Sequence, residues 1–140
     1  MTMADTVRKV RYSYVMVPNR AGTGAAVLAL LRETGVNLVA YSGFPASRGE
    51  AQIDLVTDDM AGLRRAAKRG GWRLSAVKKG FLFQGDDRIG TVHRHLAKLA
   101  KAKVSVVAAD AVTAGKGRYG MILWVKAKDY ARAARALGAR

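Results

Sequence analysis

Apolar and polar positions along the first half of the chain follow an order typical of a mixed α and β fold. Residues 12–17 are β-branched and aromatic, which favours a strand. Apolar positions within 27–31 form a helical stripe that ends near Gly35. Further along, the pattern predicts strands at 36–44, 52–57 and 72–77, a turn at 43–49 and a basic helix at 60–70.

The second half repeats this order of elements. The pattern predicts a strand at 81–84, a helix at 91–102, a strand at 104–109, a turn at 114–118, a strand at 119–125 and a helix at 129–137. The second copy therefore lacks its own fourth strand. We expect residues 7–11, the first repeat or a second chain to cover the open sheet edge.

A fixed offset of 68 residues relates the two copies. It places matching loop, helix and strand residues on one another, which indicates a duplication. We therefore divide the chain into repeats at residues 1–79 and 80–140. The matched pairs are Arg20 with Arg88, Gly22 with Gly90, Leu28 with Leu96, Leu31 with Leu99, Val36 with Val104 and Arg64 with Arg132.

Each copy has the order βαββαβ, which folds as an antiparallel sheet with both helices on one face. The predicted fold class is α+β, with two ferredoxin-like repeats. Two such repeats can join edge to edge or face to face. Either arrangement creates an interface, where we expect a ligand site.

Composition limits the class of protein. Half of the residues are apolar and the mean hydropathy is −0.02, so a packed core is possible. No stretch approaches the ~18–20 apolar residues that a membrane span requires, and residues 1–11 show no secretory signal. The chain has no cysteine, which excludes disulfides and thiolate metal sites and fits a cytoplasmic location.

The net charge of +15 is unusually high. Residues 1–79 carry 13 basic and 6 acidic side chains, and residues 80–140 carry 12 and 4, so neither half is a basic tail. The densest cationic stretches, 64–69 and 126–135, lie in predicted helices. Two interpretations remain open: solvated helix faces, or a surface that binds nucleic acid or another polyanion.

The loop 18–24 joins a strand to a helix start and is the strongest candidate for ligand binding. Free backbone N–H groups there can hold a carboxylate, and Gly22 and Gly24 allow close approach. Asn19 can both donate and accept, which suits a zwitterion. Asn37 begins the next strand and could meet Asn19 only across an interface between copies. Taken singly, Asn19 as a turn residue and Asn37 as a helix terminator are equally reasonable.

These residues resemble the ACT domain family. The run 17–22 with Leu28, Leu31 and residues 35–38 follows the ACT pattern, and residues 85–90 with Leu96, Leu99 and Val104 follow it again. The resemblance covers about residues 11–137. Residues 41–45 and 117–125 are similar to small bacterial proteins that consist of two ACT domains.

The resemblance implies a regulatory protein, not an enzyme, that binds an amino acid at an ACT–ACT interface. In the ACT domain of phosphoglycerate dehydrogenase, two asparagines at positions matching Asn19 and Asn37 hold serine. The second repeat has Asp87 and Ser105 there, so the first repeat is the favoured site. We expect a homodimer with a small-molecule ligand and an unknown protein partner, and we expect no cofactor and no metal. The implied binding residues are Asn19, Arg20, Ala21, Gly22, Asn37 and Leu38, with Asp87, Arg88, Ile89, Gly90 and Ser105 in the second repeat.

Other functions fit less well. The third glycine of a dinucleotide fingerprint at residues 22–27 is replaced by Val27. Residues 79–83 resemble half of an RNA-binding motif, but Phe81 and Phe83 suit a core face better, so a nucleic-acid-binding protein is the alternative. His93 and His95 point apart on a helix, which disfavours a metal site. The acidic residues, including the pair 86–87 before a helix, suit N-caps better than catalysis.

Overall fold

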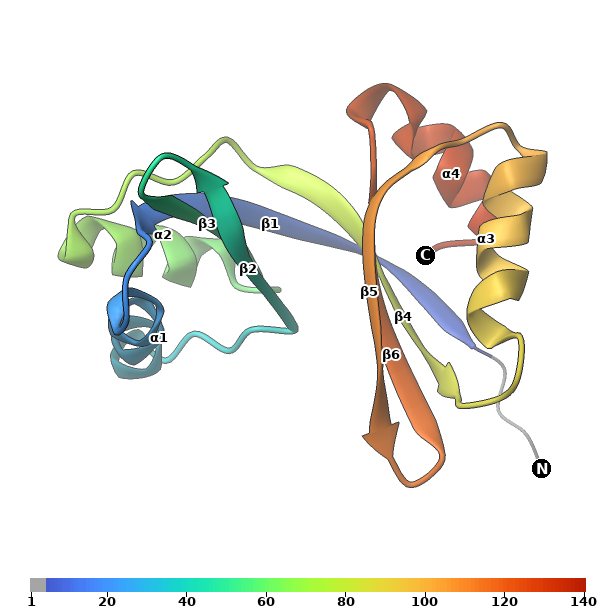
Figure 1. Cartoon of the computed structure of the whole chain (residues 1–140), viewed down its shortest axis with the longest axis horizontal. Helices are drawn as coiled ribbons and strands as arrows, with labels where there is room; N and C mark the ends of the chain where they lie inside the picture. Colours follow the sequence, from blue (N-terminus) through green and yellow to red (C-terminus); the bar gives the residue numbers. More distant parts are fainter. Residues whose placement is uncertain (1–4) are drawn as a thin grey trace. The chain divides into compact units, whose positions relative to one another are not determined.

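A computed structural model describes residues 5–140, and its backbone contacts divide the chain into two compact units (Figure 1). The first unit comprises residues 11–78, and the second comprises residues 5–10 together with 79–140. Strand β1 (Thr6–Pro18) contributes its first five residues to the second unit and the remainder to the first. The structure therefore groups residues 5–10 with the second half, whereas the sequence placed them in the first repeat.

The first unit consists of β1, α1 (Thr23–Thr34), β2 (Ala40–Ser47), β3 (Glu50–Val56) and α2 (Met60–Gly70). Its strands lie in the antiparallel order β2-β3-β1, and both helices lie on one side of them. The strand predicted at 72–77 is not regular. Only Leu74 bridges Val15, and the Tyr14 N–H donates to the Ser75 hydroxyl rather than to a backbone carbonyl, which breaks the ladder.

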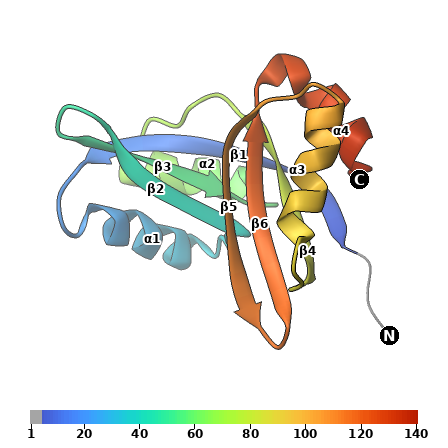
Figure 2. The ribbon, with the colours of Figure 1, turned by 45° about the vertical axis from the view of Figure 1, so that its right-hand side comes forward.

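The second unit consists of β4 (Lys78–Asp86), α3 (Thr91–Lys101), β5 (Val106–Gly115), β6 (Arg118–Val125), a 3₁₀ turn η1 (Ala127–Asp129) and α4 (Tyr130–Leu137). Helices α3 and α4 lie on the same side of the strands (Figure 2). The strand order is β1-β4-β6-β5, so Thr6–Val10 occupies the position of the missing fourth strand. The chain end flanks it, because Arg140 exchanges backbone hydrogen bonds with Val7 and Lys9.

The 68-residue offset holds through the strand registers. Tyr41 pairs with Leu55 as Ala109 pairs with Leu123, and both helices start after a left-handed glycine, at φ 94° and 82°. The offset shortens to 67 in the last helices, which end at Gly71 and Gly138. By this offset Arg132 corresponds to Arg65, so the predicted match of Arg64 with Arg132 is wrong by one residue.

Each unit has its own core between sheet and helices. In the first unit, the core includes Val15, Leu31 and Leu63, and in the second it includes Phe81 and Phe83, both fully buried. The prediction that these two phenylalanines belong to a core is confirmed. They cannot serve as a stacking platform for nucleic-acid bases.

Two strands differ from their predicted bounds for one physical reason. Gly35 is left-handed, and the Val36 N–H donates back to the Leu31 carbonyl, so the chain still closes the helix at 35–36 and β2 begins only at Ala40. The equivalent closure delays β5 to Val106. Both strands then run further than predicted, to Ser47 and Gly115.

Lys103 occupies the left-handed position after α3, at φ 59°, where the first unit has Gly35. A non-glycine residue pays about 1 kcal/mol there. Lys103→Gly should therefore raise the free energy of unfolding by about 1 kcal/mol, measured by urea denaturation. Lys98→Gly, within α3, should lower it by about the same amount, and equal effects of both changes would contradict the assignment.

Candidate functional site

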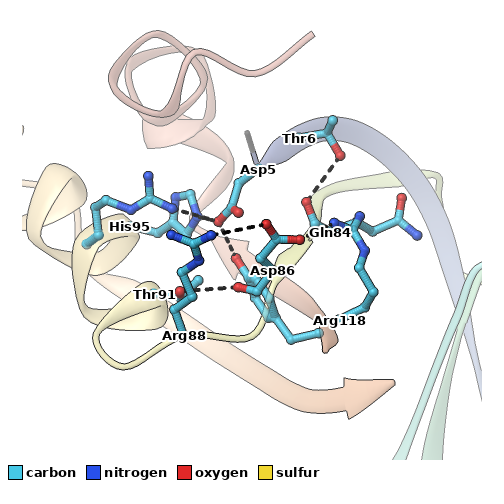
Figure 3. A network of polar contacts seen from close by, with 10 residues as sticks. Asp5, Thr6, Gln84, Asp86, Arg88, Thr91, His95 and Arg118 are labelled. Carbon is cyan, nitrogen blue, oxygen red and sulfur yellow. Dashed lines mark hydrogen bonds and ion pairs between the residues drawn. The ribbon is translucent and has the colours of Figure 1, made fainter. Parts of the chain in front are cut away.

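A buried carboxylate organises one end of the second unit (Figure 3). The side chain of Asp5 is 7% exposed, and its Oδ2 lies 2.8 Å from Arg94 Nη2, 2.7 Å from His95 Nε2 and 2.7 Å from the Tyr119 hydroxyl. Arg94 and His95 come from α3, and Tyr119 comes from β6. The carboxylate thus joins the start of β1 to a helix and a strand of the second unit.

Gly85 of β4 makes room for this carboxylate. A Cβ atom at that position would overlap the carboxylate of Asp5. Any larger residue at 85 would force Asp5 out of the network. The pair Asp5 and Gly85 therefore determines how the beginning of β1 lies beside β4.

Charge and burial oppose each other in this network. Burial raises the pKa of Asp5, but the hydrogen bonds from His95 and Tyr119 and the charge of Arg94 outweigh it, so the pKa lies below its ordinary value. Burial lowers the pKa of His95, and the contact with Asp5 opposes this only in part. His95 Nδ1 is buried without a hydrogen-bond partner within residues 5–140, so a second ring proton would find no acceptor. Burial and the contact with Asp5 also raise the pKa of Tyr119.

A pocket of about 390 Å³ opens on the same unit. The loop after β4 and the first turn of α3 form one wall, and the far end of β5 forms the other. Tyr119 belongs to both features, because its side chain lines the pocket and its hydroxyl donates to Asp5. The lining residues are Asp87, Arg88, Gly90, Thr91, Val92, His93, Ala111, Val112, Thr113 and Tyr119.

The α3 N-terminus at this pocket has no side-chain cap and no acid in its first turn. The sequence suggested Asp86 and Asp87 as caps, and the structure corrects this. Asp86 instead pairs with Arg118 at 2.9 Å and with Arg88 at 3.7 Å, and Asp87 lines the pocket. The Thr91 N–H donates to the Arg88 carbonyl at 3.2 Å, so within residues 5–140 the N–H groups of Val92 and His93 are the ones left open to an anionic group.

The sequence-predicted site residues lie in several places. Asp87, Arg88 and Gly90 line the pocket, whereas the Ile89 side chain is fully exposed. Ser105 lies beyond the opposite end of α3. In the first unit, residues 19–22 are exposed and precede α1, while Asn37 and Leu38 follow it; a helix of 12 residues is about 18 Å long.

Sequence reasoning missed the β5 wall of the pocket. Ala111, Val112 and Thr113 were placed outside the strand that was predicted to end at 109. Val112 and Thr113 are β-branched residues, which favour a strand, and this signal would have extended the predicted strand. Thr91, Val92, His93 and Tyr119 were also not singled out for ligand binding.

In the first unit, a tyrosine ring stands at the place that corresponds to the pocket. Gly24 and Gly43 match the pocket residues Val92 and Ala111 by the 68-residue offset. A Cβ atom on Gly24 would lie 3.1 Å from the Tyr41 hydroxyl, and one on Gly43 would lie 3.4 Å from it. The second unit has Ala109 at the position of Tyr41, which leaves this space open.

Residues 5–140 contain no group of three or more His, Asp and Glu side chains that could hold a metal ion. His95 is buried against Asp5, and His93 faces the pocket, so the two point apart as predicted. Of the helices in the described part of the chain, none is long and apolar enough to span a membrane.

No family model and no curated protein matches the sequence. Solved structures are similar in fold. A protein from Bacteroides thetaiotaomicron has a TM-score of 0.74 at 14% identity, covering 96% of this chain and 88% of its own. The regulatory subunit of aspartate kinase from Thermus thermophilus, in its ligand-free form, has a TM-score of 0.68 at 12% identity, with 98% and 96% covered. The corresponding subunit from Thermus flavus has a TM-score of 0.63 at 14% identity, with 99% and 95% covered. This likeness supports an ACT-like fold.

Replacing Asp5 with asparagine should destabilise the protein by about 3 kcal/mol at pH 7, because a neutral amide cannot accept from three donors around a buried site. The folded pKa of Asp5 lies below the ordinary 3.8, so its contribution is fully present above pH 5 and is lost as the pH falls below 3.8. The gap between wild type and Asp5→Asn in urea unfolding should close over that range. The exposed change Asp110→Asn should alter stability by less than about 0.5 kcal/mol, and a gap that stays constant with pH would contradict the ionised carboxylate.

Proposed function

We propose that this chain is a regulatory protein of two ACT-type repeats that binds an amino acid in the pocket of the second unit. The observation that carries the proposal is the pocket itself, which lies at the β4–α3 loop beside an uncapped helix terminus. The fold of the aspartate kinase regulatory subunits supports a sensing role over a catalytic one.

The pocket offers a partner for each part of an amino acid. The α-carboxylate fits the N–H groups of Val92 and His93 in the first turn of α3, assisted by the guanidinium of Arg88. The ammonium group fits the carboxylate of Asp87. Ala111 and Val112 leave an apolar wall for the side chain, which favours a small or aliphatic one.

A ligand bound in the pocket would affect the position of the start of β1. Tyr119 touches the ligand space and holds Asp5, which in turn anchors the fourth strand of the unit. A ligand that favours one position of Tyr119 therefore shifts the equilibrium of that strand, and this differential affinity is the basis of regulation. We further propose that the protein acts as a homodimer and that Asn19 and Asn37 form a second site across an interface between copies.

The first test is thermal unfolding of the protein with each of the twenty amino acids at millimolar concentration. A ligand at 100 times its dissociation constant adds about 2.7 kcal/mol of stability, which corresponds to a shift of several degrees at this length. We expect one amino acid or a group of small ones to produce that shift. A flat panel would contradict amino-acid binding.

Ala111→Leu then tests the location of the site, because a leucine side chain would fill the pocket that Ala111 lines. Affinity for the amino acid found above, measured by calorimetry, should fall at least tenfold. Ala100→Leu makes the same substitution at an exposed position on α3, away from the pocket, and should leave affinity unchanged. If Ala111→Leu retains full affinity while Asn19→Ala loses it, the site lies in the first unit instead.

A further inference from the structure

The outer surface of α3 and α4 is strongly basic. Helices α3 and α4 lie side by side (Figures 1 and 2), and Arg132 joins them by donating to the carbonyls of Ala102 and Lys103 at 3.1 and 3.2 Å. We call this surface the α3–α4 face. Its exposed cations are Arg94, Lys98, Lys101, Lys128, Arg132 and Arg135.

Almost no carboxylate offsets these charges. The second unit carries 15 basic and 5 acidic residues, a net charge of +10, whereas the first unit carries 10 and 5, a net charge of +5. From residue 88 to the end, the only acids are Asp110 and Asp129. Asp129 is 8% exposed and already paired with Arg132, so the α3–α4 face presents no exposed acid.

The cations of α3 have no counterpart in the first unit. The 68-residue offset matches Arg94, Lys98 and Lys101 with Ala26, Leu30 and Glu33. The fold therefore does not require cations on this helix. Since Lys98 and Lys101 make no ion pair within residues 5–140, internal salt bridges do not account for them either.

The three cations of α3 are also regularly spaced along one side of the helix. Residues 94, 98 and 101 are four and three positions apart, so they share one flank of α3 with steps of about 6 and 4.5 Å along the axis. The opposite flank, with His95 and Leu99, is buried. Arg132 and Arg135 continue the charge onto α4.

We infer that the α3–α4 face binds the phosphate backbone of nucleic acid without sequence preference. Such binding rests on Lys and Arg contacts to phosphates and needs no apolar anchor. A protein partner would need an aromatic or aliphatic centre, and insertion into a membrane would need an apolar helix face. Val92, in the first turn of α3, is the single large apolar side chain exposed on either helix within the described residues, and the apolar faces of both helices are buried.

The test is fluorescence anisotropy of a labelled 20-base-pair DNA duplex of mixed sequence, titrated with the full chain at 50–300 mM NaCl. The variant Lys98→Glu/Lys101→Glu/Arg135→Glu reverses three charges of the face. The control Arg64→Glu/Arg65→Glu/Arg69→Glu makes the same change of net charge on exposed positions of α2. Should the glutamate variant not melt cooperatively, Lys98→Gln/Lys101→Gln/Arg135→Gln replaces it.

We expect the wild type to bind at 50 mM NaCl and the face variant to bind at least 30-fold more weakly. Loss of three phosphate contacts should reduce the slope of log K against log salt by about 2.7, while the α2 control changes affinity less than threefold. Equal weakening by the two variants would overturn the inference, because total charge would then explain binding. Absence of binding at 50 mM NaCl, or tighter binding to polyglutamate or anionic vesicles than to DNA, would overturn it as well.

Discussion

The edge of β4 is the constraint on which the second unit depends. A sheet edge left open exposes unpaired N–H and C=O groups, and here Thr6–Val10 satisfies them. The carboxylate of Asp5 holds that strand in place through three donors. A buried carboxylate with fewer hydrogen-bond partners would destabilise the fold by several kcal/mol. The pairing of Thr6–Val10, the hydrogen bonds to Asp5 and the space beside Gly85 therefore depend on one another.

The order of elements and the 68-residue offset could be predicted from the sequence, because both rest on local patterns of residues. It could not choose among the three candidates for the open edge, since strand pairing is a long-range event that leaves no local pattern. The signal for Asp5 was equally hidden, because the carboxylate matters only in combination with Gly85, 80 residues away. The irregularity of segment 72–77 could not be predicted for the same reason. It arises because the Ser75 hydroxyl accepts from the Tyr14 N–H, and a pattern of apolar residues does not show such a contact.

The two copies have diverged at the place where a ligand would bind. Both start their helix after a left-handed glycine, so both present backbone N–H groups to the same space. In the first unit the Tyr41 ring fills that space, and in the second a small residue, Ala109, leaves it open. The sequence favoured the first unit because asparagines suit a zwitterion, but the space available to a ligand is a second requirement that the sequence pattern does not describe. The two units therefore differ in the space beside the helix start as well as in the chemistry of the loop.

Helix α3 connects the pocket to the basic surface. Its N-terminus closes the pocket, and its later turns carry Lys98 and Lys101. The helix dipole and the net charge of +10 both raise the potential at the pocket, which favours a carboxylate entering it. Added salt should weaken capture of a zwitterion only slightly, because its charges cancel at a distance, whereas a polyanion spanning several cations releases many counterions. Two ligands on one helix would also be coupled through Arg94, which shares one flank of α3 with Lys98 and Lys101 and donates to the carboxylate that anchors β1. A phosphate that drew Arg94 away from Asp5 would loosen the fourth strand, and a ligand that tightened Tyr119 on Asp5 would keep Arg94 in place; the two events therefore oppose each other.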